Sequence, residues 1–154
     1  MTPLTASLIA TPGDLEALRR LRNECRSFMT GHTDEIGRDQ QAAWWASLRR
    51  EDWRIWLYWE GRRPVAFGLL RRQHGRWWAT LGVTEGHRGR GIGTAIYADL
   101  ARWAEGDVWI MVRRDNPGSR RAAEKAGYEL MEQDGAGYAA GLVVDILCAR
   151  KGPA

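Results

Sequence analysis

Hydrophobic residues follow two different periods along this chain of 154 residues. Seven short runs are rich in aromatic and β-branched residues and are bounded by turn residues, a pattern typical of strands. Four other segments repeat hydrophobic residues every three or four positions, which predicts helices that bury one face. The expected strands span residues 4–9, 54–60, 65–71, 76–83, 108–112, 128–132 and 138–149.

Residues at the ends help to place two of the expected helices, and hydrophobic spacing places the others. Asp14 can cap the first helix, and Gly127 follows the last one, which we expect over residues 119–126. The second and third helices are expected over about residues 39–49 and 91–104. The inward-facing residues are Leu15, Leu18, Leu21 and Cys25 in the first helix, Ala42, Trp45 and Leu48 in the second, and Ile92, Ile96, Leu100 and Trp103 in the third.

The order of these elements, β-α-α-β-β-β-α-β-α-β-β, predicts a single α/β domain with a mixed sheet. Three consecutive strands joined by short turns form an antiparallel meander, whereas the helical connections require some parallel pairing. No repeat or low-complexity linker interrupts the chain. We therefore expect one domain over residues 1–150 and a tail over residues 151–154.

The composition narrows the function classes. The formal net charge of +4 is carried mainly by arginine, but the basic residues are scattered, so nucleic-acid binding is not favoured. No hydrophobic run approaches the roughly 20 residues of a membrane span, and the N-terminus lacks signal-peptide features, so we expect a cytoplasmic protein without membrane contact. Cys25 and Cys148 are then expected to be buried thiols rather than a disulfide. No Cys/His cluster has metal-ligand spacing, so no metal is predicted.

The most informative segment is a stretch rich in glycine and arginine. Residues 83–94 read VTEGHRGRGIGT and lead from an expected strand into an expected helix. Glycines allow close approach of the backbone, and the N–H groups at a helix N-terminus favour an anion, so the stretch predicts a phosphate or pyrophosphate site. It lacks the lysine of a P-loop and the spacing of a dinucleotide fingerprint. From the residues alone, a glycine-rich turn with solvated arginines is the alternative.

Two motifs, placed in this order, resemble those of the GNAT N-acetyltransferase superfamily. The first is the RxxGxG pattern at residues 88–93, which is similar to the family's pyrophosphate loop for acyl-CoA. The second is Asn116-x-x-Ser119 followed by EKAGY at residues 124–128. With the order of elements, the resemblance covers nearly the whole chain. It implies the GNAT fold, a mixed and mostly antiparallel central sheet of about seven strands flanked by about four helices.

The resemblance implies acetyl-CoA as the co-substrate. Backbone groups at the end of the central strand would pair with the pantetheine arm, and the Val83 N–H could polarise the thioester carbonyl. The loop would wrap the pyrophosphate, with Arg88 and Arg90 facing the phosphates. The residues that the resemblance assigns to this binding are Leu81, Gly82, Val83, Arg88, Gly89, Arg90, Gly91, Ile92, Gly93, Thr94, Asn116 and Ser119.

The reaction implied is direct transfer of the acetyl group to a primary amine. The family often has a tyrosine as general acid at the position that Ala123 occupies here. Ser119 is the nearest replacement in the sequence, and protonation of the thiolate by solvent is the alternative. Glu85, at the end of the central strand, could act as the base, directly or through water, or could simply be solvated.

The acceptor is less well defined than the cofactor. In this family the segment that joins the first two helices covers the acceptor site, which makes His32 and Glu35 candidate substrate-binding residues. The leading expectation is the amine of a small molecule or of a nucleotide-linked amino sugar. A protein amine, a modified nucleobase and a non-catalytic module that holds acyl-CoA are the alternatives. A homodimer is one arrangement that the sequence allows.

Overall fold

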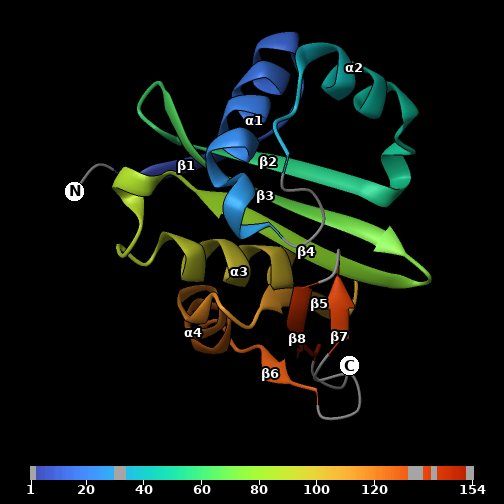
Figure 1. The fold of residues 1–154 in the computed structure, drawn as a ribbon, viewed down its shortest axis with the longest axis vertical. Coiled ribbons are helices and arrows are strands. Elements are labelled where there is room, and N and C mark those ends of the chain that lie inside the picture. The colour runs from blue at the N-terminus through green and yellow to red at the C-terminus, as the bar shows by residue number, and fades with distance from the viewer. Residues whose placement is uncertain (1–2, 30–33, 132–136, 140–141, 152–154) are drawn as a thin grey trace.

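The computed structural model describes residues 3–29, 34–131, 137–139 and 142–151 (Figure 1). In these ranges, eight strands form one sheet and four α-helices flank it. The elements in chain order are β1 (Leu4–Leu8), α1 (Pro12–Cys25), α2 (Arg38–Ser47), β2 (Trp53–Glu60), β3 (Arg63–Gln73), β4 (Arg76–Val83), α3 (Ile92–Trp103), β5 (Val108–Arg113), α4 (Pro117–Lys125), β6 (Glu129–Leu130), β7 (Gly137–Ala139) and β8 (Leu142–Ala149).

The sheet contains a single parallel pair of strands among the described residues. Its strand order is β1-β2-β3-β4-β5-β8-β6, and β7 pairs with β8. The β4–β5 pair is parallel, and every other pair is antiparallel. Helix α3 connects the two parallel strands, because a parallel pair needs a crossover. The expected fold class, a mixed and mostly antiparallel sheet flanked by helices, is confirmed.

The helices cover the two faces of the sheet in pairs. Helices α1 and α2 lie on one face, and α3 and α4 lie on the other (Figure 1). Successive side chains of a strand point to opposite faces, so β3 supplies both hydrophobic layers. Phe67 and Leu69 join the core that contains α1, whereas Ala66 and Leu70 join the core that contains α3. The centre of the sheet is therefore buried on both sides.

Helix α1 begins earlier than the sequence pattern indicates. Thr11 is its N-cap rather than Asp14. The Thr11 hydroxyl accepts a hydrogen bond from the Asp14 N–H at 3.1 Å, and the Asp14 carboxylate accepts one from the Thr11 N–H at 3.1 Å. This reciprocal capping box places Pro12 at the first helical position, where a backbone N–H would have no helical partner. Asp14 does cap the helix, but from its first turn.

Helix α2 buries a polar side chain that hydrophobic spacing does not reveal. Ala42, which was expected inside, is exposed, whereas Gln41 is buried. The Gln41 amide donates a hydrogen bond to the Leu15 carbonyl of α1. Trp45 and Leu48 pack against the core as expected. A buried amide is stable here because α1 supplies its partner, and a tertiary partner of this kind leaves no mark on the local pattern.

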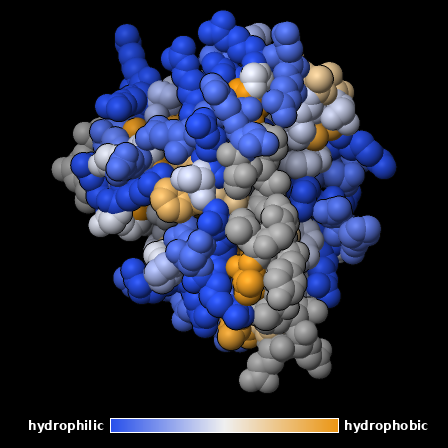
Figure 2. Space-filling model, viewed as in Figure 1, coloured by the Kyte–Doolittle hydropathy of each residue, from blue (hydrophilic) through white to orange (hydrophobic). Residues whose placement is uncertain are grey.

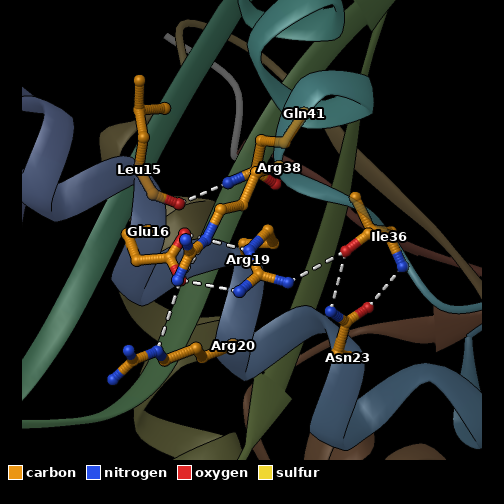
Figure 3. A network of polar contacts seen from close by, with 8 residues as sticks. All are labelled: Leu15, Glu16, Arg19, Arg20, Asn23, Ile36, Arg38 and Gln41. Atoms are coloured by element: carbon orange, nitrogen blue, oxygen red, sulfur yellow. Dashed lines mark hydrogen bonds and ion pairs between the residues drawn. The ribbon is translucent and has the colours of Figure 1, made fainter.

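Polar contacts hold the segment before α2 against α1 (Figure 3). The Asn23 side chain accepts a hydrogen bond from the Ile36 N–H at 2.7 Å and donates one to the Ile36 carbonyl at 3.0 Å. Arg19 donates to the same carbonyl at 3.1 Å and forms an ion pair with Glu16 at 2.6 Å. The hydrogen bond from Arg19, assisted by the charges of two further arginines, lowers the pKa of Glu16 to about 2. The chain that enters α2 is therefore fixed by α1.

The C-terminal strands differ in detail from the expectation. The strand expected over residues 138–149 is two strands, because β7 and β8 pair antiparallel with Ala139 opposite Leu142. Strand β6 is shorter than the expected 128–132, and residue 132 lies outside the described residues. Tyr128 belongs instead to the turn that ends α4, since its N–H donates to the Ala123 carbonyl at 3.0 Å.

The surface seen in Figure 2 is mostly hydrophilic, and hydrophobic side chains show there only in small patches. Within the described ranges, no helix combines the length and the hydrophobicity that crossing a membrane requires.

Lys151, which the sequence places in the tail, donates a hydrogen bond from its ammonium group to the Ala101 carbonyl at 2.7 Å.

We expect Gly82→Ala to destabilise the protein by about 1–3 kcal/mol, as overpacked cores do. A Cβ at position 82 would lie 2.5 Å from Cε1 of Phe67 and 2.9 Å from Sγ of Cys25, inside the core between β4 and α1. Gly86→Ala is the matched control, because a Cβ there meets nothing within 4 Å. Urea unfolding of both variants measures the difference. Equal midpoints for Gly82→Ala and wild type would contradict the close packing at this strand.

Candidate functional site

The central feature of the site is the opening between β4 and β5. These parallel strands pair only at their first residues, Trp77 with Val108 and Trp78 with Trp109. Strand β4 continues to pair with β3 as far as Val83, and β5 continues to pair with β8 to its own end. The two strands therefore diverge, and the backbone of β4 beyond its paired residues presents an edge to the space between them.

A cavity of about 410 Å³ occupies this opening. Its walls come from the end of β4, the glycine-rich loop, α3, the end of β5, the start of α4, and the chain at the end of α1. Every residue that the sequence assigns to the cofactor lines this cavity except Arg90, which is exposed. The structure thus brings together two motifs that lie more than 20 residues apart in the chain.

The glycine-rich loop ends at the N-terminus of α3. Gly89 and Gly91 have φ angles of +77° and +80°, a backbone region that side chains disfavour. Gly91 is the N-cap of α3, and no side chain caps the helix there. The first N–H groups of a helix have no partner within the helix, so those of α3 are available to an anion. The expected phosphate site therefore has the backbone geometry that it needs.

The Arg88 side chain turns into the site rather than outward. Its Nε donates a hydrogen bond to the Val83 carbonyl at 3.0 Å, and its guanidinium lies over the Phe28 ring with 4.7 Å between Cζ and the ring centroid. Arg88 makes no ion pair with any carboxylate of the described residues. Its charge is therefore placed between the end of β4 and the chain that follows α1.

A buried histidine fixes the loop to the sheet. The side chain of His87, 8% exposed, lies 3.0 Å from the Thr84 hydroxyl through Nδ1 and 3.3 Å from the Glu60 carboxylate through Nε2. Its backbone N–H also donates to the Thr84 carbonyl at 3.0 Å. These contacts hold the 3₁₀ turn Glu85–His87 between β4 and the loop. His87 is therefore part of the support of the loop that we expect to bind phosphate.

The N-terminus of α4 forms the opposite wall. Asn116 is the N-cap of this helix, and its Oδ1 accepts a hydrogen bond from the Ser119 N–H at 3.3 Å. The Ser119 hydroxyl lies 2.7 Å from the hydroxyl of Tyr97, which comes from α3. Burial raises the pKa of Tyr97, although the hydrogen bond with Ser119 acts in the opposite direction. Ala123, where the family often has tyrosine, is fully buried.

The other predicted residues lie away from the cavity or outside the described ranges. Glu85 is exposed and does not line the cavity; its N–H donates to the carboxylate of Glu24 at 3.1 Å. Glu35 is also exposed and does not line the cavity. His32 falls outside the described residues. The structure thus supports the predicted cofactor residues more directly than the predicted catalytic and acceptor residues.

Several lining residues were not expected from the sequence. Cys25, Phe28 and Met29 close the cavity on the side of α1, and Arg113 closes it at the end of β5. The Cys25 thiol lies 3.5 Å from the Val83 carbonyl, and burial raises its pKa despite the nearby Arg88. No local motif marks these residues, because they reach the cavity only through the packing of α1 on the sheet. In the described part of the chain, no group of three or more His, Cys, Asp or Glu residues could hold a metal ion.

An opening between parallel strands, with an anion-binding loop and a helix N-terminus at its end, defines a site for an extended ligand that carries phosphate. Such a site suits an acyl-CoA. The model of the acetyltransferase (GNAT) family matches residues 15–128, and the chain belongs to this family. The match includes the RxxGxG loop and the Asn116 motif. No curated protein matches the chain.

Solved structures share the fold along almost their whole length. A candidate phosphinothricin N-acetyltransferase has a TM-score of 0.81 at 20% identity, covering 98% of this chain and 100% of its own. The spermidine N-acetyltransferase of Vibrio cholerae, solved with CoA and spermine, gives 0.78 at 14% identity, with 94% of each chain covered. A phosphinothricin acetyltransferase of Sinorhizobium meliloti, solved with acetyl-CoA, gives 0.75 at 14% identity and covers 99% of this chain and 90% of its own. At these identities the likeness is one of fold.

We expect Asn116→Ala to lower the stability of the protein by about 1 kcal/mol, the usual effect of losing an N-cap. The Asn116 side chain is the acceptor for the Ser119 N–H, and alanine leaves that donor without its cap. Asn116→Asp is the matched control, since it keeps an oxygen acceptor in the same place. Denaturant midpoints of the two variants give the comparison. A drop of the same size in both would show that capping is not what Asn116 contributes.

Proposed function

We propose that this protein is an acetyl-CoA-dependent N-acetyltransferase that moves the acetyl group directly to a primary amine of a small molecule. The observation that carries this proposal is the opening between β4 and β5. The anion-binding loop and the N-terminus of α4 both line the one cavity that occupies this opening. The family of the chain and the bound CoA or acetyl-CoA of two structural neighbours support the same ligand.

In the proposed complex, backbone groups hold most of the cofactor. The edge of β4 at Leu81, Gly82 and Val83 would pair with the pantetheine amides as an added strand. The loop and the α3 N-terminus would bind the pyrophosphate, with Arg90 at the rim. Asn116 and Ser119 would contact the pantetheine arm from α4. This assignment leaves few side chains for the chemistry.

The proposed reaction is a single displacement at the thioester. The amine nitrogen attacks the acetyl carbon, the C–N bond forms, and the C–S bond breaks with its electron pair on sulfur. The Val83 N–H would stabilise charge on the carbonyl oxygen. The nitrogen must lose a proton, and Glu85, which lies outside the cavity lining, could take that proton only through water.

The acceptor would enter beside Phe28 and Met29, on the α1 side of the cavity. The guanidinium of Arg88 faces this region without an ion pair to a described carboxylate. Such a cation favours an acceptor that carries a carboxylate or phosphate near its amine, and an amino acid or a nucleotide-linked amino sugar has this character.

The wild-type protein should bind CoA and acetylate members of a panel of primary amines. A ligand at a hundred times its Kd stabilises a protein by about 2.7 kcal/mol, so CoA should raise Tm clearly. The panel should contain amino acids, nucleotide-linked amino sugars and polyamines, and release of free CoA measures transfer. Absence of any Tm change with millimolar CoA would overturn the acyl-CoA site. A Tm change without transfer to any amine would favour a binding module.

We expect Gly91→Val to abolish CoA binding while the protein stays folded. A branched side chain at the α3 N-cap would stand between the pyrophosphate and the helix N–H groups. Gly75→Val is the matched control: its φ of +76° is close to the +80° of Gly91, and it lies in the β3–β4 turn away from the cavity. Both variants should lose similar stability, but only Gly91→Val should lose the CoA response in calorimetric titration. Equal CoA affinity in both would place the phosphate elsewhere.

A further inference from the structure

A hydrogen-bonded pair of hydroxyls lies in the wall of the cavity. The Tyr97 phenol of α3 and the Ser119 hydroxyl of α4 are 2.7 Å apart, and both residues line the cavity that contains the end of β4. Tyr97 is 4% exposed, and its backbone carbonyl accepts a hydrogen bond from the Tyr128 hydroxyl at 2.9 Å. The phenol is therefore held firmly by its own helix and by the chain that follows α4.

The hydrogen bond between Tyr97 and Ser119 uses only one of their two hydroxyl hydrogens. Two hydroxyls carry two hydrogens, and one of them lies between Tyr97 and Ser119. Neither hydroxyl has another hydrogen-bond partner among the described residues. Either oxygen can be the donor of this bond; when the phenol, the more acidic group, donates to Ser119, the Ser119 O–H is left free to point into the cavity. Burial raises the pKa of Tyr97, which keeps the phenol protonated and able to donate.

We propose that Tyr97 positions the Ser119 hydroxyl to donate a hydrogen bond to the CoA sulfur as the thioester breaks. The proposal rests on the proposed function. Ser119 then acts as the catalytic residue for the leaving group, and Tyr97 acts through it. The C–S bond breaks with its electrons on sulfur, the Ser119 O–H stabilises that charge, and the thiolate later takes its proton from solvent. Neither hydroxyl loses its proton in the step.

The surroundings of Ala123 support this role. Position 123 is where the resemblance places a tyrosine, and the methyl group of Ala123 offers no hydrogen bond. Ala123 is fully buried and belongs to the same core as Tyr97, one helical turn beyond Ser119. In the proposal, α3 supplies the phenol that α4 lacks, because Tyr97 positions the Ser119 hydroxyl toward the cavity.

Steady-state kinetics of a double-mutant cycle tests whether Tyr97 acts through Ser119. Tyr97→Phe removes only the hydroxyl and should lower kcat about tenfold with little change in KM for acetyl-CoA, because the bond to sulfur strengthens in the transition state. Ser119→Ala should do the same, and the double variant should be no worse than either. Tyr58→Phe is the matched control: it removes another buried phenol hydroxyl, which bonds the Asp99 carboxylate outside the cavity lining, and kcat should hold. Additive losses, or an unchanged kcat in Tyr97→Phe, would overturn the proposal.

Titration of the CoA thiol in the complex tests the contact without turnover. The ultraviolet absorbance of the thiolate is followed against pH, with desulfo-CoA as the blank. Wild type should hold the pKa of the bound thiol below that of free CoA, and Tyr97→Phe and Ser119→Ala should each raise it by about 1 relative to wild type. The charged and titratable groups that also line the cavity are the same in all three proteins: Cys25, His87, Arg88, Arg113, Arg121 and Lys125.

The outcomes separate this proposal from the proposed function. An equal thiol pKa in the three proteins, with acetyl transfer intact in wild type, would overturn the hydroxyl pair alone. A pKa that rises in both variants, without transfer to any amine, would support the pair while the proposed reaction fails. Failure of wild type to bind CoA would overturn both.

Discussion

The end of pairing between β4 and β5 is the constraint on which the rest of the site depends. Each strand keeps its other neighbour along its length, so the sheet does not fall apart where the two diverge. Their paired ends carry Trp78 and Trp109, whose rings lie 6.2 Å apart, and the guanidinium of Arg76 stacks on Trp109 at 4.0 Å. The paired end is therefore closed by large side chains, and the open end is left to a ligand.

The divergence also explains why two helices meet at the cavity. Helix α3 follows β4 through the glycine-rich loop, and α4 starts just after β5 ends, so the N-termini of both helices lie on the open side of the strands. Their hydrophobic faces share one core with the sheet, which includes Ile96, Leu100 and Ala123. Packing in that core fixes the two N-termini relative to each other. An anion site and a pair of hydroxyls from different helices can then face the same space.

The sequence predicts those parts of the site that depend on the backbone. Positive φ angles favour glycine, so Gly89 and Gly91 mark the loop in the sequence itself. The strands and helices are also predictable from the sequence, because their hydrophobic residues repeat with the local period of each element. The errors are tertiary in origin: Gln41 is buried because α1 offers it a carbonyl, and the sequence could not show this. Cys25 and Tyr97 reach the cavity through helix packing: the sequence pattern places Cys25 only on a hydrophobic face, and it does not single out Tyr97.

The contrast between features set by the local backbone and features set by helix packing explains why the cofactor is easier to identify than the acceptor. Binding through N–H and C=O groups constrains a few glycines and a strand edge, and these leave a pattern that survives when side chains change. In our proposal, chemistry at the thioester and recognition of the amine use side chains from the α1 side, α3 and α4, and different helices can supply the same group. A tyrosine at position 123 would need space that the core around Ala123 does not have, because Ala123 is fully buried beside Tyr97. In our proposal the hydroxyl that acts on the sulfur therefore comes from Ser119, and the phenol of Tyr97 positions it.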